Sequence, residues 1–516
     1  MALLALCLSP LVAHADWTFT RGDANGDAAI DLSDAIAGLG FLFSGDPAAC
    51  LDALDTNDDG ANDLSDPIST LGYLFNAGSP PPSPFPDCGT DPTPDTLDCV
   101  GPLTSCPDDT ALPNIVLIVA DDFGVDLMSA YGEGADTPCT PRLDALAAQG
   151  LLYRNAWAAP ACSPTRATIQ TGRYGFRTGI GTVIQGMAPG LSLAETTIPE
   201  VIGGYSTAYL GKWHLSGNLG NMHPNQSGYD HFAGTVRGAL PDYSSWTKIV
   251  NGQPTPTTNY ATIDTADDAI TTLTTLPEPW FAQVNFHAPH DPWHAPPIAL
   301  CPATCPTGFC STLPPNPNPR QFVKAMVESM DSEIGRVLDA IDSQTNTYVI
   351  FIGDNGTVRQ ATEAPFNPMH AKGTVYEGGV NIPFVVRGPG VVAGETAALV
   401  GTVDLFATVA ELAGETSTAE DSVSLVPTFG DPTATVRTTI YAETFQGSAA
   451  FPPITEHERA VRDSRYKLIR VDGEPDEFYD LLVDPFESTN LLPGLTAAQQ
   501  VAHDALVAEL VALGVD

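Results

Sequence analysis

From residue 114 onward, short apolar and β-branched runs alternate with stretches of helical periodicity, and this alternation constrains the fold more than any other feature of the sequence. Residues 114–120 and 347–352 have the length and composition of buried strands, and residues 322–341 between them have a helical pattern. Strands that alternate with helices form parallel sheets, because each parallel connection needs a crossover that a helix supplies. The sequence therefore predicts an α/β domain with a mixed, mostly parallel sheet flanked by helices.

The last part of the chain has a different pattern. Short candidate strands at 460–462 and 466–470 precede a helical segment that follows Thr496. We expect a small antiparallel-sheet subdomain over residues 436–516, and we assign residues 113–435 to the main domain.

Residues 16–80 contain an internal repeat, in which Asp23 of one copy corresponds to Asp55 of the other, 32 residues later. Each copy places Asp or Asn at positions 1, 3, 5, 9 and 12 of a twelve-residue loop, a spacing that wraps a hard cation with oxygen ligands. The candidate calcium ligands are Asp23, Asn25, Asp27, Asp31 and Asp34 in the first loop and Asp55, Asn57, Asp59, Asp63 and Asp66 in the second. Each loop runs into a predicted helix, over 35–43 and 67–75, and we expect the Leu and Phe faces of the two helices to pack on each other.

This repeat resembles a dockerin domain, the paired calcium-loop module that docks a cohesin partner. The resemblance implies an α-helical, EF-hand-like module with two bound Ca²⁺ ions. Two positions depart from the ordinary EF-hand, because position 12 is Asp rather than Glu and position 6 of the first loop is Ala28. A cohesin-like partner is one implication, and a calcium-stiffened appendage without a partner is the alternative.

Residues 81–112 are rich in Pro, Asp and Thr and have no apolar periodicity, which is typical of a stiff linker. We expect Cys88, Cys99 and Cys106 to form disulfides in this segment, one of them with Cys50.

The number of cysteines is also informative. Removal of residues 1–15 with a signal peptide would leave nine of the 10 cysteines, and setting Cys162 aside leaves eight, enough for four disulfides. Three of these, Cys301, Cys305 and Cys310, form a candidate insertion near His290. They could bind zinc, but export favours disulfides, and we expect the insertion to shape the substrate entrance.

The chain carries 62 acidic and 21 basic residues, a formal net charge of −41. Such a surface repels nucleic acid and anionic membranes, so neither is an expected partner. It indicates either a saline environment or a solubilising surface.

Residues 1–15 form a short apolar run ending in Ala-His-Ala, which resembles a signal peptide although no basic residue precedes the run. No other apolar stretch is long enough to span a bilayer. The sequence predicts an exported protein that is secreted, periplasmic or at the cell surface.

Acidic or amide pairs follow two of the predicted strands. Asp121 and Asp122 follow the strand at 114–120, and Asp354 and Asn355 follow the strand at 347–352. Ligands gather at the carboxyl ends of strands in open parallel sheets, and oxygen side chains suit a hard divalent ion. One such pair alone can be a helix N-cap, but two pairs in one sheet predict a metal site.

Cys162 lies in the sequence Pro-Ala-Cys-Ser-Pro-Thr-Arg over residues 160–166, and Gly172-Arg173 follows. This resembles the sulfatases of the alkaline-phosphatase superfamily, whose signature is Cys/Ser-x-Pro-x-Arg, and the resemblance covers about residues 113–491. It implies an alkaline-phosphatase-like fold and sulfate ester hydrolysis. In that family a formylglycine-generating maturation enzyme oxidises the cysteine to formylglycine.

Formylglycine suits a sulfate ester because its hydrate carries two hydroxyls on one carbon. In the chemistry that the resemblance implies, one hydroxyl attacks sulfur and expels the alcohol, and the other then loses a proton so that sulfate leaves by C–O cleavage. A metal ion, usually calcium in this family, favours ionisation of the hydroxyl and balances the sulfate charge. The ligands that the resemblance implies are Asp121, Asp122, Asp354 and Asn355.

The remaining family positions are occupied as well. Residues 211–214 read Gly-Lys-Trp-His, residues 286–290 read Phe-His-Ala-Pro-His, and Lys372 precedes Glu-Gly-Gly. The resemblance implies that Lys212 and Lys372 contact sulfate, that Arg166 orients formylglycine, that His214 handles a proton of the second hydroxyl and that His290 is the general acid. The roles of His287 and His294 stay open. One departure is Asn381, where the family commonly has arginine, and it affects local packing or substrate contacts.

Lysine is scarce, since Lys212, Lys248, Lys324, Lys372 and Lys467 are the only five in the chain. Two of the five fall in the predicted sulfate site. Converging cations are what a sulfate group needs inside a chain of charge −41.

The sequence thus favours a sulfatase acting on a sulfated small molecule or glycan. The closest alternative enzyme is a phosphodiester or phosphonate monoester hydrolase of the same superfamily. The alternative outside enzymes is a non-catalytic calcium-binding scaffold protein.

Overall fold

The computed structural model describes residues 18–27, 29–86, 88–93, 95–99, 106, 112–305, 308–448 and 451–516. The chain divides into two compact units, residues 1–112 and 113–516. The predicted signal peptide lies outside the described residues. None of the helices in the described part of the chain is long and apolar enough to cross a membrane.

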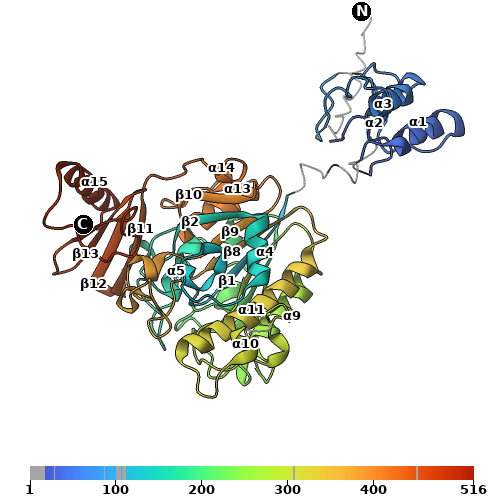
Figure 1. Ribbon diagram of the computed structural model, residues 1–516. Coiled ribbons are helices and arrows are strands. Elements are labelled where there is room, and N and C mark those ends of the chain that lie inside the picture. Colours follow the sequence, from blue (N-terminus) through green and yellow to red (C-terminus); the bar gives the residue numbers. More distant parts are fainter. Residues whose placement is uncertain are drawn as a thin grey trace, which may run out of the picture. The chain divides into compact units, whose positions relative to one another are not determined.

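The larger unit is built on a ten-stranded mixed sheet (Figure 1). In spatial order its strands are β10 (Gly394–Gly401), β2 (Leu151–Trp157), β9 (Phe384–Arg387), β8 (Thr347–Gly353), β1 (Asn114–Ala120), β7 (Trp280–Asn285), β3 (Ser206–Lys212), β4 (His231–Thr235), β5 (Trp246–Val250) and β6 (Gln253–Thr257). β1 lies between β7 and β8 and is parallel to both, and β3 is parallel to β7 and β4. β9 and β5 supply the antiparallel pairs. The predicted mostly parallel sheet is confirmed.

Helices cover both faces of this sheet, because the central strands are apolar on both sides. One core lies between the sheet and α4 (Pro141–Gln149), α9 (Ala261–Leu273) and α11 (Pro319–Ile341). The other lies against α5 (Cys162–Thr171), α7 (Ile198–Val201), α13 (Leu405–Leu412) and α14 (Val426–Gly430). Four shorter helices, α6 (Gly175–Thr178), α8 (His223–Gln226), α10 (Phe309–Thr312) and α12 (Glu377–Val380), lie in the connections.

A second, four-stranded antiparallel sheet follows in the same unit, in the order β11 (Ile440–Ser448), β12 (Phe451–Arg462), β13 (Tyr466–Val471) and β14 (Glu477–Asp480). The terminal helix α15 (Ala497–Leu513) packs on this sheet through Leu506 and Leu510. The predicted small antiparallel C-terminal sheet is confirmed.

The smaller unit contains α1 (Leu32–Ser44), α2 (Leu51–Leu54) and α3 (Ser65–Phe75). Both predicted helices are present, and Asp31 caps the first one by accepting from the backbone N–H of Ser33 at 2.7 Å. Residues buried on them include Ala35 and Gly38 of α1 and Pro67 and Thr70 of α3, and Gly38 faces Pro67.

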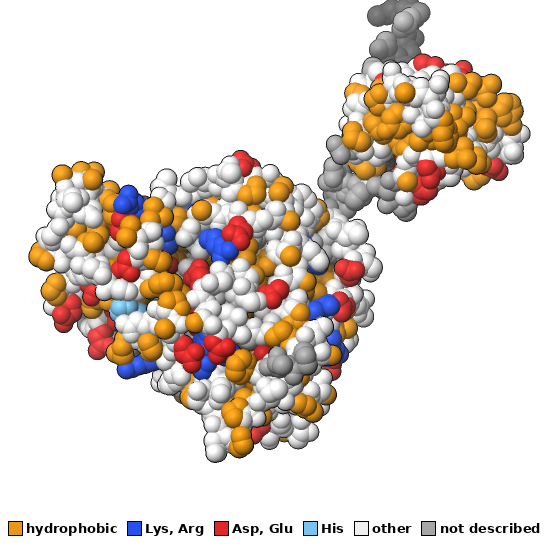
Figure 2. All heavy atoms as spheres, in the orientation of Figure 1, with side chains coloured by type: hydrophobic (Ala, Val, Ile, Leu, Met, Phe, Trp, Pro, Cys, Tyr) orange, Lys and Arg blue, Asp and Glu red, His pale blue; other side chains and the backbone are white. Residues whose placement is uncertain are grey.

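The prediction that the apolar helix faces bury each other is wrong for four residues of the predicted helices, and Leu32 and Leu64 just before those helices are exposed as well. Leu32, Ile36 and Phe43 are 50%, 60% and 73% exposed, and their repeat counterparts Leu64, Ile68 and Phe75 are 48%, 59% and 70% exposed. The reason is that the helices meet through small side chains, so the large ones remain outside. We call these six residues the exposed apolar set. Figure 2 shows apolar side chains gathered over one face of this unit.

The sequence predicts a stiff linker held by disulfides over residues 81–112, and the described part of residues 81–99 packs on the smaller unit. Phe19 exchanges backbone hydrogen bonds with Gly89, at 3.0 Å each. The buried guanidinium of Arg21 donates to the carbonyl of Ser83 and pairs with Asp91 at 2.7 Å. This segment lacks an apolar pattern because backbone bonds, an ion pair and disulfides hold it.

Eight cysteines form four disulfides, as the cysteine count predicted: Cys50–Cys99, Cys88–Cys106, Cys139–Cys305 and Cys301–Cys310. Cys162 is the one free cysteine in the described part of the chain. The zinc alternative for the 301–310 insertion is wrong, since all three cysteines are oxidised. One of them ties the insertion to Cys139, a long-range bond that the local spacing did not reveal.

Candidate active site

The predicted site residues meet at the carboxyl edge of the large sheet, because they follow neighbouring parallel strands. Asp121 and Asp122 follow β1, and Asp354 and Asn355 follow β8 beside it. The backbone N–H of Asp122 donates to a carboxylate oxygen of Asp354 at 3.0 Å. Lys212 ends β3, and His287 and His290 follow β7.

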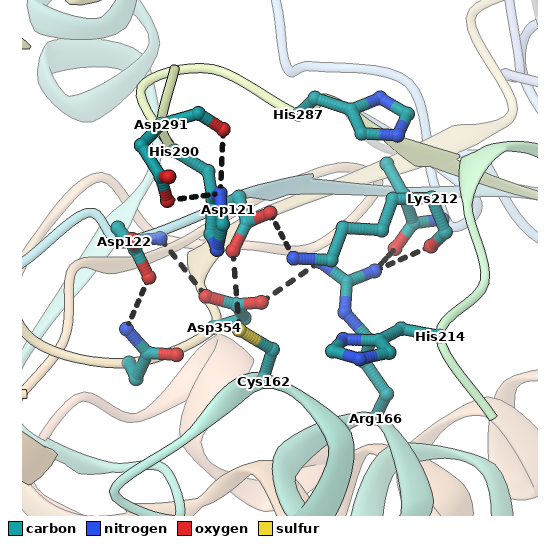
Figure 3. Close-up of polar contacts among 12 residues, drawn as sticks. Asp121, Asp122, Cys162, Arg166, Lys212, His214, His287, His290, Asp291 and Asp354 are labelled. Atoms are coloured by element: carbon teal, nitrogen blue, oxygen red, sulfur yellow. Dashed lines mark hydrogen bonds and ion pairs between the residues drawn. The ribbon is translucent and has the colours of Figure 1, made fainter. Parts of the chain in front are cut away.

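Cys162 is the first residue of α5 and is fully buried. Its Sγ lies 3.4 Å from a carboxylate oxygen of Asp121 and 3.5 Å from Nζ of Lys372 (Figure 3 shows the contact with Asp121). Burial and the neighbouring Asp121 carboxylate raise the pKa of the Cys162 thiol to about 12. The unmodified cysteine is therefore protonated at neutral pH and is a poor nucleophile.

Three cations and three carboxylates pair one to one around Cys162. Lys212 pairs with Asp121 and Lys372 with Asp122, and Arg166 pairs with Asp354 at 2.8 Å. Although burial favours the neutral acid, Lys212 and the other surrounding cations hold the pKa of Asp121 well below its ordinary value. Burial disfavours the ammonium of Lys372, but Asp122 raises its pKa well above the ordinary value. The three ion pairs thus lie close together around one buried cysteine.

The oxygen side chains at this edge fit a calcium ion. The second carboxylate oxygen of Asp122 and the amide oxygen of Asn355 are buried and have no hydrogen-bond partner. The amide NH₂ of Asn355 donates to Asp122 at 2.9 Å, which leaves its oxygen free for another contact. Ligand atoms of Asp121, Asp122, Cys162 and His290 lie within 4.8 Å of one another. Buried oxygens that lack donors are what a hard divalent cation requires.

Arg166 fixes the geometry of the site from within. Its buried guanidinium donates to the carbonyl of Lys212 at 2.6 Å and to the side-chain oxygen of Asn285 at 3.1 Å, besides its pair with Asp354. The Tyr209 hydroxyl donates to the same Lys212 carbonyl at 2.8 Å. The sequence analysis missed Asn285 and Tyr209, and the signal available was the position of Asn285 at the carboxyl end of β7 and of Tyr209 three residues before Lys212 in β3.

The predicted catalytic histidines occupy different environments. His290 lies beside the Asp121–Cys162 pair (Figure 3), and its Nδ1 is 2.9 Å from the carbonyl of Asp291, so Nε2 is available to a substrate. His214 contacts the carbonyl of Ile184 through Nε2 at 3.2 Å, and its Nδ1 is buried without a partner. Burial and the nearby Lys212 hold the pKa of His214 well below its ordinary value, so the ring is neutral.

The two histidines left open by the sequence are now placed. His287 is buried, with Nε2 2.8 Å from the Thr235 hydroxyl, and burial and Lys212 hold its pKa well below the ordinary value. His294 is held at both ring nitrogens, by Tyr260 and by the carbonyl of Pro292, which is a structural role.

The loop that carries Lys372 is tied to the second sheet. Glu377, at the start of α12, is buried and accepts from Nζ of Lys467 at 3.1 Å. Lys467 is fully buried and also pairs with Glu487 at 2.7 Å, and a carboxylate oxygen of Glu487 accepts from the backbone N–H of Glu377 at 2.6 Å. The second sheet therefore supports one of the lysines of the site.

All five lysines are inside or half-buried, and each is paired with a carboxylate. Lys248 bridges Asp264 and Asp268, and Lys324 pairs with Asp136. With Lys212, Lys372 and Lys467 paired as described, no lysine is exposed.

Residues 113–415 match the family described as Sulfatase, which is more than half of the chain. The chain belongs to the sulfatase family. Residues 368–513 also match the family described as N-sulphoglucosamine sulphohydrolase, C-terminal, which covers the second sheet.

Several curated relatives are members of the same family. Human arylsulfatase A is 30% identical over 458 residues, which cover 76% of this chain and 86% of the relative. Arylsulfatase G of Rattus norvegicus and human N-acetylgalactosamine-6-sulfatase are each 30% identical, over 58% and 61% of this chain. The chain spans 65% of the length of each of these two.

Solved structures show the same fold. Ps i-CgsB in complex with k-i-k-neocarrahexaose has a TM-score of 0.66 at 24% identity, covering 77% of this chain and 92% of that one. A 2-O GAG sulfatase has a TM-score of 0.58 at 22% identity, covering 78% and 93%. The sulfatase fold predicted from the sequence is therefore confirmed.

Proposed function

We propose that this family member hydrolyses sulfate esters of a sulfated carbohydrate at the Cys162 site. The observation that carries the proposal is the free, fully buried Cys162 at the start of α5, within 3.5 Å of Asp121 and Lys372. The printed names of relatives support a carbohydrate, since one is an N-acetylgalactosamine-6-sulfatase and one structure holds a neocarrahexaose.

The nucleophile requires conversion of Cys162 to formylglycine by a maturation enzyme. The raised pKa of the thiol supports this requirement, because the unmodified side chain offers neither a thiolate nor a hydroxyl. When present, the hydrated aldehyde supplies one hydroxyl for attack on sulfur and a second for release of the product.

Lys212 and Lys372 would hold the sulfate group. Each now pairs with a carboxylate, Asp121 or Asp122, that belongs to the proposed calcium ligands together with Asp354 and Asn355. A calcium ion at these oxygens supplies positive charge that balances the carboxylates. The ammonium groups of the lysines can then contact the sulfate oxygens. Arg166 holds the Lys212 backbone and Asp354 in position through its hydrogen bond and ion pair.

Two histidines would move protons. His290, whose Nδ1 is held by Asp291, would donate a proton from Nε2 to the leaving oxygen. His214, neutral in its buried position, would accept a proton during product release, and its unpartnered Nδ1 is the atom available for this. A buried and neutral imidazole is suited to accept rather than donate.

The proposal extends to the smaller unit as a calcium-dependent docking module. In both loops the position-12 carboxylate accepts a backbone N–H from the position-9 residue, Asp31 to Asp34 and Asp63 to Asp66, at 2.9 Å each. Burial, and to a smaller extent the nearby acidic residues, raise the pKa of Asp66 to about 6. The oxygen-rich loops fit Ca²⁺, and the exposed apolar set supports a protein partner of the cohesin type. Four disulfides support export to an oxidising compartment.

The decisive experiment combines mass spectrometry and enzyme assay. The chain is expressed with a formylglycine-generating enzyme, and the mass of the peptide that contains Cys162 is measured. Sulfate esters and phosphodiesters are then assayed in parallel as substrates. We expect formylglycine at position 162 and turnover of sulfate esters that Cys162→Ala and Lys372→Ala each abolish. Turnover confined to phosphodiesters would support the alternative hydrolase, and an unmodified thiol would support the scaffold protein.

A further inference from the structure

Two hollows lie side by side at the mouth of the active site. The first has a volume of about 380 Å³ and is lined by His214 and His290 together with residues 183–186 and 236–239. The second, of about 420 Å³, lies between residues 179–185 and the Gln446–Gly447 end of β11. Both are lined by Val183, Ile184 and Gln185, so they form one continuous groove that leads away from the catalytic histidines.

No acidic residue lines either hollow. This is unusual in a chain with 62 acidic residues, and it means that a bound anion would meet no carboxylate in the groove. The charged side chain in the groove is Arg237, which is exposed.

Arg237 differs from almost every other cation in this protein. Of the 21 Lys and Arg residues, all but three pair with a described acidic residue. The three are Arg237, Arg359 and Arg387. Arg237 is held over the groove by one hydrogen bond, from its guanidinium to the carbonyl of Gly186 at 3.2 Å, and the rest of its donors are free for a ligand.

The segment that carries Arg237 is fixed to the catalytic centre. The Thr235 hydroxyl contacts His287 at 2.8 Å and the carbonyl of Arg237 at 3.1 Å. Gly238 lies directly on the His214 ring, since a Cβ there would come within 2.3 Å of ring atoms. A side chain at position 238 would displace the ring, so the glycine holds Arg237 beside the site.

The opposite wall is fixed as well. The backbone N–H of Ile184 donates to the Ser163 hydroxyl at 3.0 Å, one residue from Cys162. The carbonyl of Gly181 accepts from the backbone N–H of Phe445 at 3.2 Å and from the hydroxyl of Thr444 at 3.1 Å. The groove therefore has pre-formed walls between α5 and β11, which favours selective binding.

We propose that Arg237 binds a second anionic group of the substrate, a sulfate ester or a carboxylate, on a sugar unit next to the one whose sulfate reaches Cys162. The substrate class is then an oligosaccharide with at least two anionic groups. The sulfate of one sugar unit contacts Lys212 and Lys372, and the next sugar unit lies in the groove that no acidic residue lines. This inference rests on the proposed sulfatase function and specifies its substrate. Arginine suits the task because its planar donors match both sulfate and carboxylate oxygens.

The test uses three disaccharides that carry the same hydrolysable sulfate. The second unit is neutral in the first, sulfated in the second and a uronate in the third. For the wild-type chain with formylglycine at position 162, we expect kcat/KM to be about tenfold higher on the substrate whose second anion Arg237 binds. Arg237→Gln removes this preference through KM and leaves the neutral disaccharide unchanged. The sulfated and uronate arms identify which anion is recognised.

Arg387→Gln is the matched control. Arg387 also lacks an ion pair with a described acidic residue, and it donates to Gln149 at the end of β9, far from the carboxyl edge of β8. Its replacement by glutamine changes the net charge by the same amount as Arg237→Gln. We expect the preference to persist in this variant. Equal losses on all three substrates in Arg237→Gln, or a wild-type enzyme with no preference, would overturn the proposal.

Binding measurements separate this inference from the proposed function. The Kd of the sulfated and uronate disaccharides is measured by calorimetric titration, which needs no turnover. The two proteins compared are Cys162→Ala and the double variant Cys162→Ala with Arg237→Gln. A roughly tenfold weaker Kd in the double variant supports the Arg237 site even if sulfate esters prove not to be the reacting group. If instead the wild-type enzyme hydrolyses the neutral disaccharide and the single and double variants bind each anionic disaccharide with the same Kd, the sulfatase proposal stands and the Arg237 proposal fails.

Discussion

The two units of this chain differ in how much apolar core lies beneath their side chains. The smaller unit exposes large apolar residues, with Phe43 73% and Phe75 70% accessible. The larger unit keeps charge inside, with Lys212, Lys324 and Lys467 fully buried and each paired with a carboxylate. The comparison indicates two different sources of stability.

Among its described residues the smaller unit has a small buried apolar cluster, which consists of Phe19, Cys50, Ala53 and Cys99. Small domains of this kind depend on disulfides or bound metals. The larger unit has an extensive apolar core on each face of its sheet, so it can accommodate buried ion pairs that serve the active site. Stability therefore comes from covalent and ionic cross-links in one unit and from apolar packing in the other.

The largest expected effect on stability follows from removing a buried lysine. Lys467→Met leaves Glu487 buried without its cation and leaves Glu377 with only its 3.5 Å pair to Arg462, which costs about 3–5 kcal/mol of unfolding free energy. Chemical denaturation, followed through the unfolding transition of the larger unit, measures this loss of unfolding free energy. Lys248→Met is the matched control, because Lys248 also bridges two carboxylates but is partly exposed, and we expect about 1 kcal/mol or less. Equal losses in the two variants would contradict the buried network.

The next effect concerns a disulfide of the smaller unit. Replacing both Cys50 and Cys99 with serine removes a bond between residues 49 apart and lowers the stability of this unit by about 2–4 kcal/mol. Calorimetry should show the loss in the transition of the smaller unit, with sulfate ester turnover unchanged. The Cys301–Cys310 bond, between residues 9 apart, is the comparison, and its removal should cost less. A loss of turnover in the Cys50 and Cys99 variant would show that the units are coupled.

Calcium removal should act on the same unit. At a calcium concentration of 100 times Kd, binding to one loop stabilises the folded unit by about 2.7 kcal/mol, so a chelator should lower its melting temperature. Asp34→Ala combined with Asp66→Ala should abolish the response. A chelator effect that persists in this variant would place the stabilising calcium elsewhere.

The smallest effect is expected at the exposed apolar set. Phe43→Ser together with Phe75→Ser should change unfolding free energy by about 0.5 kcal/mol or less, because neither ring loses buried contacts. Phe19→Ala, at a buried position, should cost about 3–5 kcal/mol. If the serine variant is as unstable as Phe19→Ala, the two phenylalanines are part of a core and the comparison of the two units is wrong.

Much of the site could be predicted because strand ends are readable from sequence. β1 and β8 are continuous apolar runs, and parallel pairing brings the residues that follow them to one edge. The motif around Cys162 carried the resemblance, and the resemblance supplied Cys162, Lys212, His214, His290 and Lys372.

Other features depend on contacts between distant segments and could not be predicted. The Cys139–Cys305 bond joins residues 166 apart, and the groove joins residues 179–185 to β11. Residues 81–99 lack periodicity, so their cysteines, one of which was expected to bond Cys50, were the signal available for their packing on the smaller unit. The amphipathic pattern of α1 and α3 predicted burial, but small residues at their contact left the larger apolar ones outside.

The placement of lysine has a practical consequence for handling the protein. Because every lysine amine is shielded and held by a carboxylate, reagents that acylate amines find few targets on the folded chain. Immobilisation, fluorescent labelling or cross-linking through lysine amines would reach Lys248 and Lys372, which are each 17% exposed, and reaction at Lys372 would inactivate the enzyme. Coupling through carboxylates suits this protein better, since acidic groups outnumber amines on its exterior.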